Sequence, residues 1–170
     1  KKLMARTGLE PERLRLEWVS AAEGERFAEI IRDFTSHVKR LGPSPLAREK
    51  PDETILANVR AAKGAAGSSR LRTLVGREKK LTEEANVYGE KVAQEEFDKL
   101  MQESINEEHL RSRIYLLTKH APVSIGELAK WLNADPSVVL RHIVVMRRRG
   151  LLAVDRIEGD TPLYVALEVR

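Results

Sequence analysis

Residues 8–42, GLEPERLRLEWVSAAEGERFAEIIRDFTSHVKRLG, decide how the rest of this chain is interpreted. Polar and apolar residues alternate from Arg13 to Val19, which is the pattern of a β-strand. The alternation places Leu14, Leu16 and Trp18 on one face. Because a lone strand leaves its backbone N–H and C=O groups without partners, the predicted strand must join a sheet.

The predicted strand leads directly into a predicted helix. Ser20 and Glu23 have the spacing of a capping box, so we expect the helix to begin at Ser20. Gly42 and Pro43 are typical of its end. One helical face is apolar and consists of Phe27, Ile30, Ile31, Phe34, Val38 and Leu41. A strand followed by such a helix is typical of an α/β layer, and no other convincing strand lies nearby. We therefore expect that this segment borrows a sheet or closes a larger protein.

Composition limits the chemistry that the chain can carry. The sequence contains no cysteine, which excludes disulfides, thiolate metal sites and cysteine nucleophiles. The four histidines, at positions 37, 109, 120 and 142, have no metal-ligand spacing with one another, and no catalytic constellation stands out. No apolar run approaches the roughly 20 residues that span a bilayer, and no signal peptide pattern is present. We predict a cytoplasmic chain in which no residue is catalytic, binds a cofactor or binds a metal.

The middle of the chain separates its charges. Residues 60–80 hold seven basic residues and one acid, whereas residues 83–108 hold nine acids and two lysines. One interpretation is two solvated helix faces that attract each other. The other is a basic docking strip for an acidic partner or a nucleic acid. The sequence leaves both open.

Residues 106–170 follow the order of a winged helix. Ser124 and Glu127 form a second capping box, and Asp135 followed by Pro136 predicts the start of a third helix that ends at Gly150. The helix after Ser124 is expected to turn Leu128, Trp131 and Leu132 inward. Two alternating segments, 151–157 and 162–168, are joined by a turn and predict a β-hairpin.

The third helix of this module suggests its function. Val139, Ile143 and Met146 are expected to be buried, which turns Leu140, Arg141, Val144 and Val145 outward. Aliphatic side chains give no hydrogen-bond readout of bases and do not attract phosphate. We therefore predict that Leu140, Val144 and Val145 bind a protein partner. The alternative is a DNA-binding transcriptional regulator that uses Arg141, His142, Arg147, Arg148 and Arg149.

The segment EPERLRLEWVSAAEGERFAEII, within residues 8–34, resembles the C-terminal end of the methyl-viologen-reducing hydrogenase delta-subunit family. The resemblance implies a heterodisulfide-reductase-associated iron–sulfur subunit. Such a subunit passes electrons between a hydrogenase or formate dehydrogenase and a heterodisulfide-reductase-type flavoprotein. The family's cluster ligands are cysteines upstream of the matching segment, so none can be assigned to this chain. The iron–sulfur cluster is implied for an upstream part of the parent protein, which would belong to an oxidoreductase complex.

Together these observations predict a mainly α chain in three parts. Residues 1–43 would be the C-terminal end of an α/β iron–sulfur domain, residues 44–105 a linker and helical region, and residues 106–170 a winged helix-turn-helix domain. The leading hypothesis is the C-terminal portion of an electron-transfer subunit, in which the winged helix is an assembly or docking module. The expected partners are the other subunits of the redox complex, with DNA as the alternative and no membrane.

Overall fold

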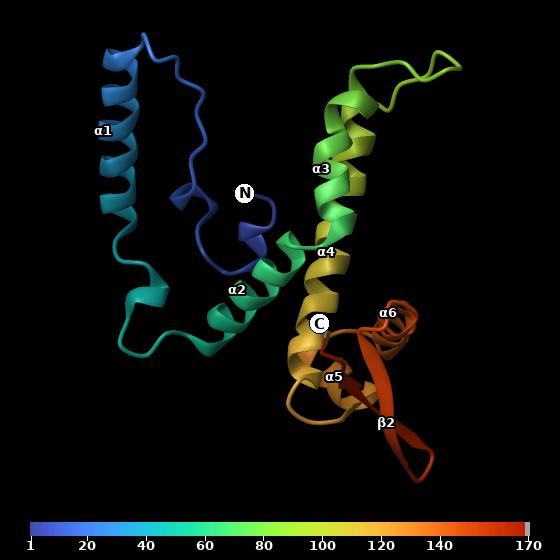
Figure 1. Ribbon diagram of the computed structural model, residues 1–170. Coiled ribbons are helices and arrows are strands. Elements are labelled where there is room, and N and C mark those ends of the chain that lie inside the picture. Colours follow the sequence, from blue (N-terminus) through green and yellow to red (C-terminus); the bar gives the residue numbers. More distant parts are fainter. Residues whose placement is uncertain (169–170) are drawn as a thin grey trace. The chain divides into compact units, whose positions relative to one another are not determined.

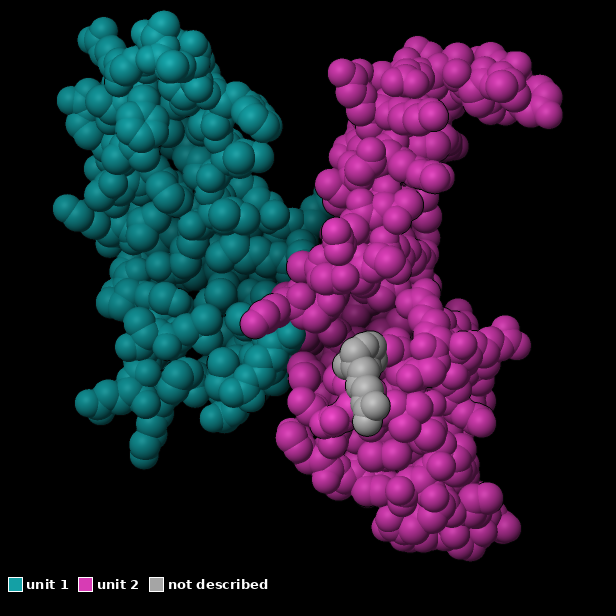
Figure 2. All heavy atoms as spheres, in the orientation of Figure 1, with its two compact units in different colours: residues 1–60 teal, residues 61–170 magenta. Residues whose placement is uncertain are grey.

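A computed structural model describes residues 1–168, most of which are helical, with strands only toward the C-terminal end (Figure 1). The prediction of a mainly α chain is confirmed. The chain divides into two compact units, residues 1–60 and residues 61–170, which are coloured separately in Figure 2. Each unit is described by itself. The last two residues of the predicted third domain, 169 and 170, lie outside the described residues.

The first unit is built around helix α1, Gly24–Leu41. It also contains the beginning of helix α2, Glu53–Ala66, which continues into the second unit. Three short 3₁₀ helices complete it: Met4–Arg6, Pro11–Arg13 and Pro45–Ala47. Gly8 turns the chain between the first two with a φ of +85°, and a Cβ there would lie 3.3 Å from Ile55 Cγ1. A glycine is therefore required at this position.

The segment predicted as a strand has no strand partner among the described residues. Arg13 ends a 3₁₀ helix, and residues 14–19 form no ladder with any strand of the described residues. Alternation specifies the two faces of a segment, but a strand exists only where another strand accepts its hydrogen bonds. Residues 1–168 contain no sheet that this segment joins, so the prediction that its sheet comes from elsewhere stays a prediction.

The helix after this segment begins four residues later than predicted. The Ser20 N–H donates to the Glu23 carboxylate over 2.8 Å, and the Ala22 N–H donates to Ser20 Oγ over 3.3 Å. These bonds close a turn, and α1 starts at Gly24. Ser20 Oγ accepts from the Ala22 N–H and not from the Glu23 N–H, so only one of the two hydrogen bonds of the predicted capping box forms.

The second unit begins with a pair of helices, α3, Ser69–Thr82, and α4, Gln94–Thr118. Ser68 caps α3 by accepting from the Leu71 N–H. The end of α2 packs closely on α4, because a Cβ at Gly64 would collide with the Ser112 side chain. Helix α4 is continuous over 25 residues and spans the boundary between the second and third predicted parts of the chain.

A small antiparallel sheet follows α4. Its strands are β1, Val123–Ser124, β2, Leu152–Glu158, and β3, Thr161–Ala166, in the order β1-β3-β2. The predicted hairpin is confirmed as β2 and β3, whereas the two-residue β1 was not predicted. Asp155 interrupts the register of β2 as a bulge.

Two helices lie between β1 and β2: α5, Ile125–Leu132, and α6, Pro136–Arg148. Both hydrogen bonds of the predicted Ser124–Glu127 capping box form, and Asp135 caps α6. Trp131 is 54% exposed, so the prediction that it points inward is wrong. The predicted burial of Val139, Ile143 and Met146 is confirmed. They pack in one core with Ile114, Val123, Leu128, Ala129, Leu152 and Tyr164.

Candidate interaction surfaces

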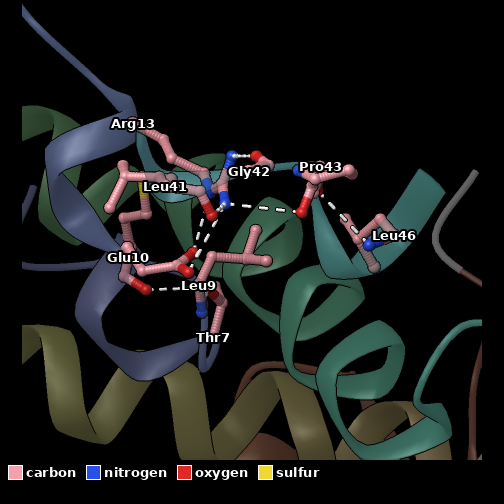
Figure 3. A network of polar contacts seen from close by, with 10 residues as sticks. Thr7, Leu9, Glu10, Arg13, Leu41, Gly42, Pro43 and Leu46 are labelled. Carbon is pink, nitrogen blue, oxygen red and sulfur yellow. Dashed lines mark hydrogen bonds and ion pairs between the residues drawn. The ribbon is translucent and has the colours of Figure 1, made fainter. Parts of the chain in front are cut away.

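Arg13 holds the N-terminal segment against the end of α1 (Figure 3). Its guanidinium donates to the carbonyl oxygens of Gly42 and Leu41 over 2.9 and 3.2 Å, and to the Glu10 carboxylate over 2.7 Å. The last carbonyls of a helix have no partner within the helix, so Arg13 supplies the missing donors. The hydrogen bond with Glu10 raises the pKa of Arg13 and lowers the pKa of Glu10.

Arg15 fixes the extended segment along the side of α1. Its Nη1 lies 2.5 Å from Asp33 Oδ2 on the helix, and its Nε lies 2.9 Å from Glu17 Oε1. The hydrogen bond to Asp33, and then the one to Glu17, raise the pKa of Arg15. The polar side of the segment therefore has partners within the first unit.

The apolar side of the same segment has no cover among the described residues. Leu16 is 75% exposed and Trp18 is 83% exposed. Phe27 and Ile31 on α1 are exposed as well, and α1 contains no buried residue. The first unit therefore leaves these four large apolar side chains exposed, as an interaction site would.

Helix α6 presents the second candidate surface. Leu140 and Val144 are exposed, and Val145 is half-buried. Beside them a hollow of about 630 Å³ lies between α6 and β2. Val144, Leu152, Ala153 and Val154 give it an apolar lining, and Arg147 and Arg148 contribute its charges. Neither arginine forms an ion pair within the described part of the chain.

The five residues of the DNA-binding alternative differ in their exposure and in their ion pairs. His142 is only 6% exposed, so it cannot reach a nucleic acid from this fold. Burial, and then the charge of Arg111, lower its pKa. Arg149 lies 3.4 Å from the Glu108 carboxylate. Arg141, Arg147 and Arg148 remain exposed without an acidic partner among residues 1–168.

The β2–β3 hairpin has little attraction for phosphate. Arg156 lies 2.8 Å from Glu158 and 2.9 Å from Asp155, so its charge is neutralised locally. The hydrogen bonds to Glu158 and Asp155 raise its pKa. Asp160 adds a further negative charge at the turn. A hairpin of this composition favours a protein contact over a DNA backbone contact.

A group of charged side chains that joins α4 to the end of α6 was not predicted. Glu108 and Arg111 of α4 form a buried ion pair, which Arg149 joins from the end of α6. Glu107 contacts Arg111 and also pairs with Arg70 of α3. Burial acts to raise the pKa of Glu107, but Arg70 and Arg111 outweigh it and lower the pKa. The three- and four-residue spacings in α4 were the available sequence signal.

Residues 1–168 contain no cluster of three or more His, Asp or Glu side chains that could hold a metal ion. None of their helices is long and apolar enough to cross a membrane. What the fold does present are two apolar surfaces, one in each unit.

Comparison with known proteins supports the resemblance. Residues 1–42 match the family model described as methyl-viologen-reducing hydrogenase, delta subunit. The chain is 47% identical over 47 residues to an F420-non-reducing hydrogenase iron-sulfur subunit of Archaeoglobus profundus, covering 28% of this chain and 34% of that protein. It is 47% identical over 51 residues to a ferredoxin:CoB-CoM heterodisulfide reductase subunit of Methanosarcina mazei, covering 29% of this chain and 6% of that protein.

These matches cover about a third of the first relative and a small part of the second. No solved structure matches the chain. The predicted resemblance is confirmed for the N-terminal segment, which includes the exposed Leu16, Trp18 and Phe27. Over residues 1–42 the chain is therefore similar to the methyl-viologen-reducing hydrogenase delta-subunit family.

Proposed function

We propose that the chain is part of a cytoplasmic electron-transfer subunit that links a hydrogenase or formate dehydrogenase to a heterodisulfide-reductase-type flavoprotein. The names of its relatives support this proposal, since one is an iron–sulfur subunit of a hydrogenase and another is a subunit of a heterodisulfide reductase. Both names describe components of oxidoreductases that are built from subunits.

The uncovered apolar surface of residues 1–42 carries the proposal. Leu16 and Trp18 alternate on one side of a segment that lacks a sheet, and Phe27 and Ile31 are exposed on the helix beside it. Arg13 and Arg15 already hold this segment to α1. An α/β iron–sulfur domain of the complex would supply the missing strand partners and bury these side chains.

The chain itself does not fit an iron–sulfur cluster. Such clusters are held by cysteine thiolates, and the sequence contains no cysteine. The role proposed for residues 1–42 is therefore to pack against the cluster-bearing domain. The redox chemistry belongs to that domain.

The C-terminal module, residues 106–170, is proposed to be a winged helix that docks a protein. Leu140, Val144 and Val145 of α6 and the adjacent hollow provide an apolar contact surface. The neutralised Arg156 and the buried His142 disfavour DNA. In this proposal the module assembles the complex and does not regulate transcription.

The proposal is tested by anaerobic purification of the tagged full-length protein from its source cells. Mass spectrometry should find heterodisulfide reductase subunits together with hydrogenase or formate dehydrogenase subunits. The double variant Leu16→Glu/Trp18→Glu should retain at least about tenfold less of these subunits, because it places charge where the proposed complex would bury two apolar side chains. Thr35→Glu, at an exposed position of α1, is the matched control and should behave as the unmodified protein.

Two results would contradict the proposal. One is that no redox subunit accompanies the unmodified protein. The other is that the double variant retains as much as Thr35→Glu.

A further inference from the structure

The α3–α4 hairpin is ordered but has almost no interior of its own. Leu71 near the start of α3 is buried, and so is Phe97 on α4, but no side chain of residues 72–96 is buried. Isolated helices of this length are marginal in water, and their stability comes mostly from packing. The outer part of the hairpin is therefore expected to be covered by another surface.

The loop at the end of the hairpin is fixed by its own hydrogen bonds. The Asn86 side chain accepts from the N–H groups of Tyr88 and Glu90, each over 2.9 Å. The Val92 N–H donates to the Leu81 carbonyl over 2.9 Å and closes the base of the loop. Val87 and Tyr88 nevertheless remain 93% and 84% exposed. A loop that is already ordered loses little conformational freedom when it binds.

Helix α3 carries a basic stripe with an apolar centre. Arg72, Val75 and Lys79 follow one another at the spacing of a single helical face. All three are exposed, and Val75 is 62% exposed. Arg72 has no ion pair within residues 1–168, and Lys79 has only a surface pair with Glu83 over 3.8 Å.

Helix α4 carries the complementary stripe. Glu96, Leu100 and Glu103 also share one helical face, and all three are exposed. Neither acid forms an ion pair with another described residue. The ion pair of Arg70 with Glu107 joins the two helices next to Arg72 and one turn beyond Glu103, and it uses none of the stripe residues.

We infer that these stripes pair with those of a second copy of this chain. In a two-fold symmetric dimer, the basic stripe of one copy meets the acidic stripe of the other, and each contact occurs twice. Val75 and Leu100 then lie at the centre of each contact. An interface of ordinary size uses about 20–30 residues from each partner, which residues 72–96 can supply with the neighbouring turns of α4.

Sedimentation velocity of the purified chain, residues 1–170, over a range of concentrations tests this inference. The expected species has twice the mass of one 19.2 kDa chain and dissociates on dilution and at high salt. The basic-stripe variant, Arg72→Glu/Lys79→Glu, should weaken dimerisation roughly tenfold, and the acidic-stripe variant, Glu96→Lys/Glu103→Lys, should do the same. Far-UV circular dichroism checks that each variant keeps its helices.

Mixing the two variants gives the sharpest result. Each alone brings like charges together, but a pair made of one copy of each restores both attractive contacts, so the mixture should form a heterodimer. Arg147→Glu/Arg148→Glu, outside the hairpin, is the control and should leave dimerisation unchanged. A monomer at every concentration, a dimer that ignores the stripe variants, or a mixture that stays monomeric would each overturn the inference.

Discussion

Replacement of Glu108 by leucine tests how the second unit holds α6 against α4. The Glu108 side chain is 6% exposed, pairs with Arg111, and lies 3.4 Å from Arg149 at the end of α6. Glu108→Leu leaves the guanidinium of Arg111, which is only 9% exposed, without its buried partner. Removal of one member of a buried pair destabilises a protein by about 3–5 kcal/mol.

The structure places the expected loss at the lower end of that range. Glu107 remains 3.2 Å from Arg111 and still compensates part of its charge. We expect a loss of about 3 kcal/mol in the free energy of unfolding, which lowers the midpoint of urea unfolding by roughly 1–2 M. The assay is urea unfolding of the full chain, followed by circular dichroism in the far ultraviolet.

Two further variants show whether the buried charge is the cause. Glu108→Leu/Arg111→Met removes both charges and should recover most of the stability. Glu95→Leu changes an exposed acid of the same helix and should shift stability by no more than about 0.5 kcal/mol. The reasoning is refuted if Glu108→Leu behaves like Glu95→Leu, or if the double variant is as unstable as the single one.

Three other variants test the second unit. Burial and the charge of Arg111 lower the pKa of His142 below its ordinary 6.5. The neutral His142 therefore contributes its full stabilisation above pH 6.5, and this stabilisation is lost as the pH falls through the folded-state pKa. His142→Gln should flatten the pH dependence of the urea midpoint, and an unchanged profile would contradict this. Ser124→Ala removes the acceptor for the Glu127 N–H, 3.2 Å away, and should lower the unfolding free energy by about 1 kcal/mol, measured by the same urea titration. Val144→Lys/Val145→Lys should reduce co-purification of redox subunits while the circular dichroism spectrum is preserved; equal co-purification would remove α6 as a docking surface.

Local signals in the sequence located the elements of the second unit well. Asp135 followed by Pro136, and Ser124 with Glu127, each fix a helix start through bonds to the next few residues, and the structure contains those bonds. The burial of Val139, Ile143 and Met146 also followed from helical spacing. Such features depend on neighbours along the chain, which a sequence displays directly.

Features that depend on distant residues were missed. The segment from residue 14 to 19 has the alternation of a strand, but pairing requires a sheet that the described residues do not provide. The ion pair of Glu108 with Arg111 is buried and extends to Arg149 of a different helix, which no local pattern displays. Trp131 lies on an otherwise apolar face and is exposed, since periodicity orders the side chains of a helix without showing where the covering neighbour ends.

A photo-crosslink from position 18 tests most directly whether the N-terminal segment packs on an iron–sulfur domain. Trp18→benzoylphenylalanine places a crosslinking group on the exposed apolar side of this segment, where Trp18 is 83% exposed. Irradiation of the complex in anaerobic cell extract, followed by mass spectrometry, identifies the peptide in contact. The expected product is a peptide from a cysteine-containing α/β iron–sulfur domain. Absence of any crosslink, or crosslinks only to proteins outside any redox complex, would contradict the proposed packing.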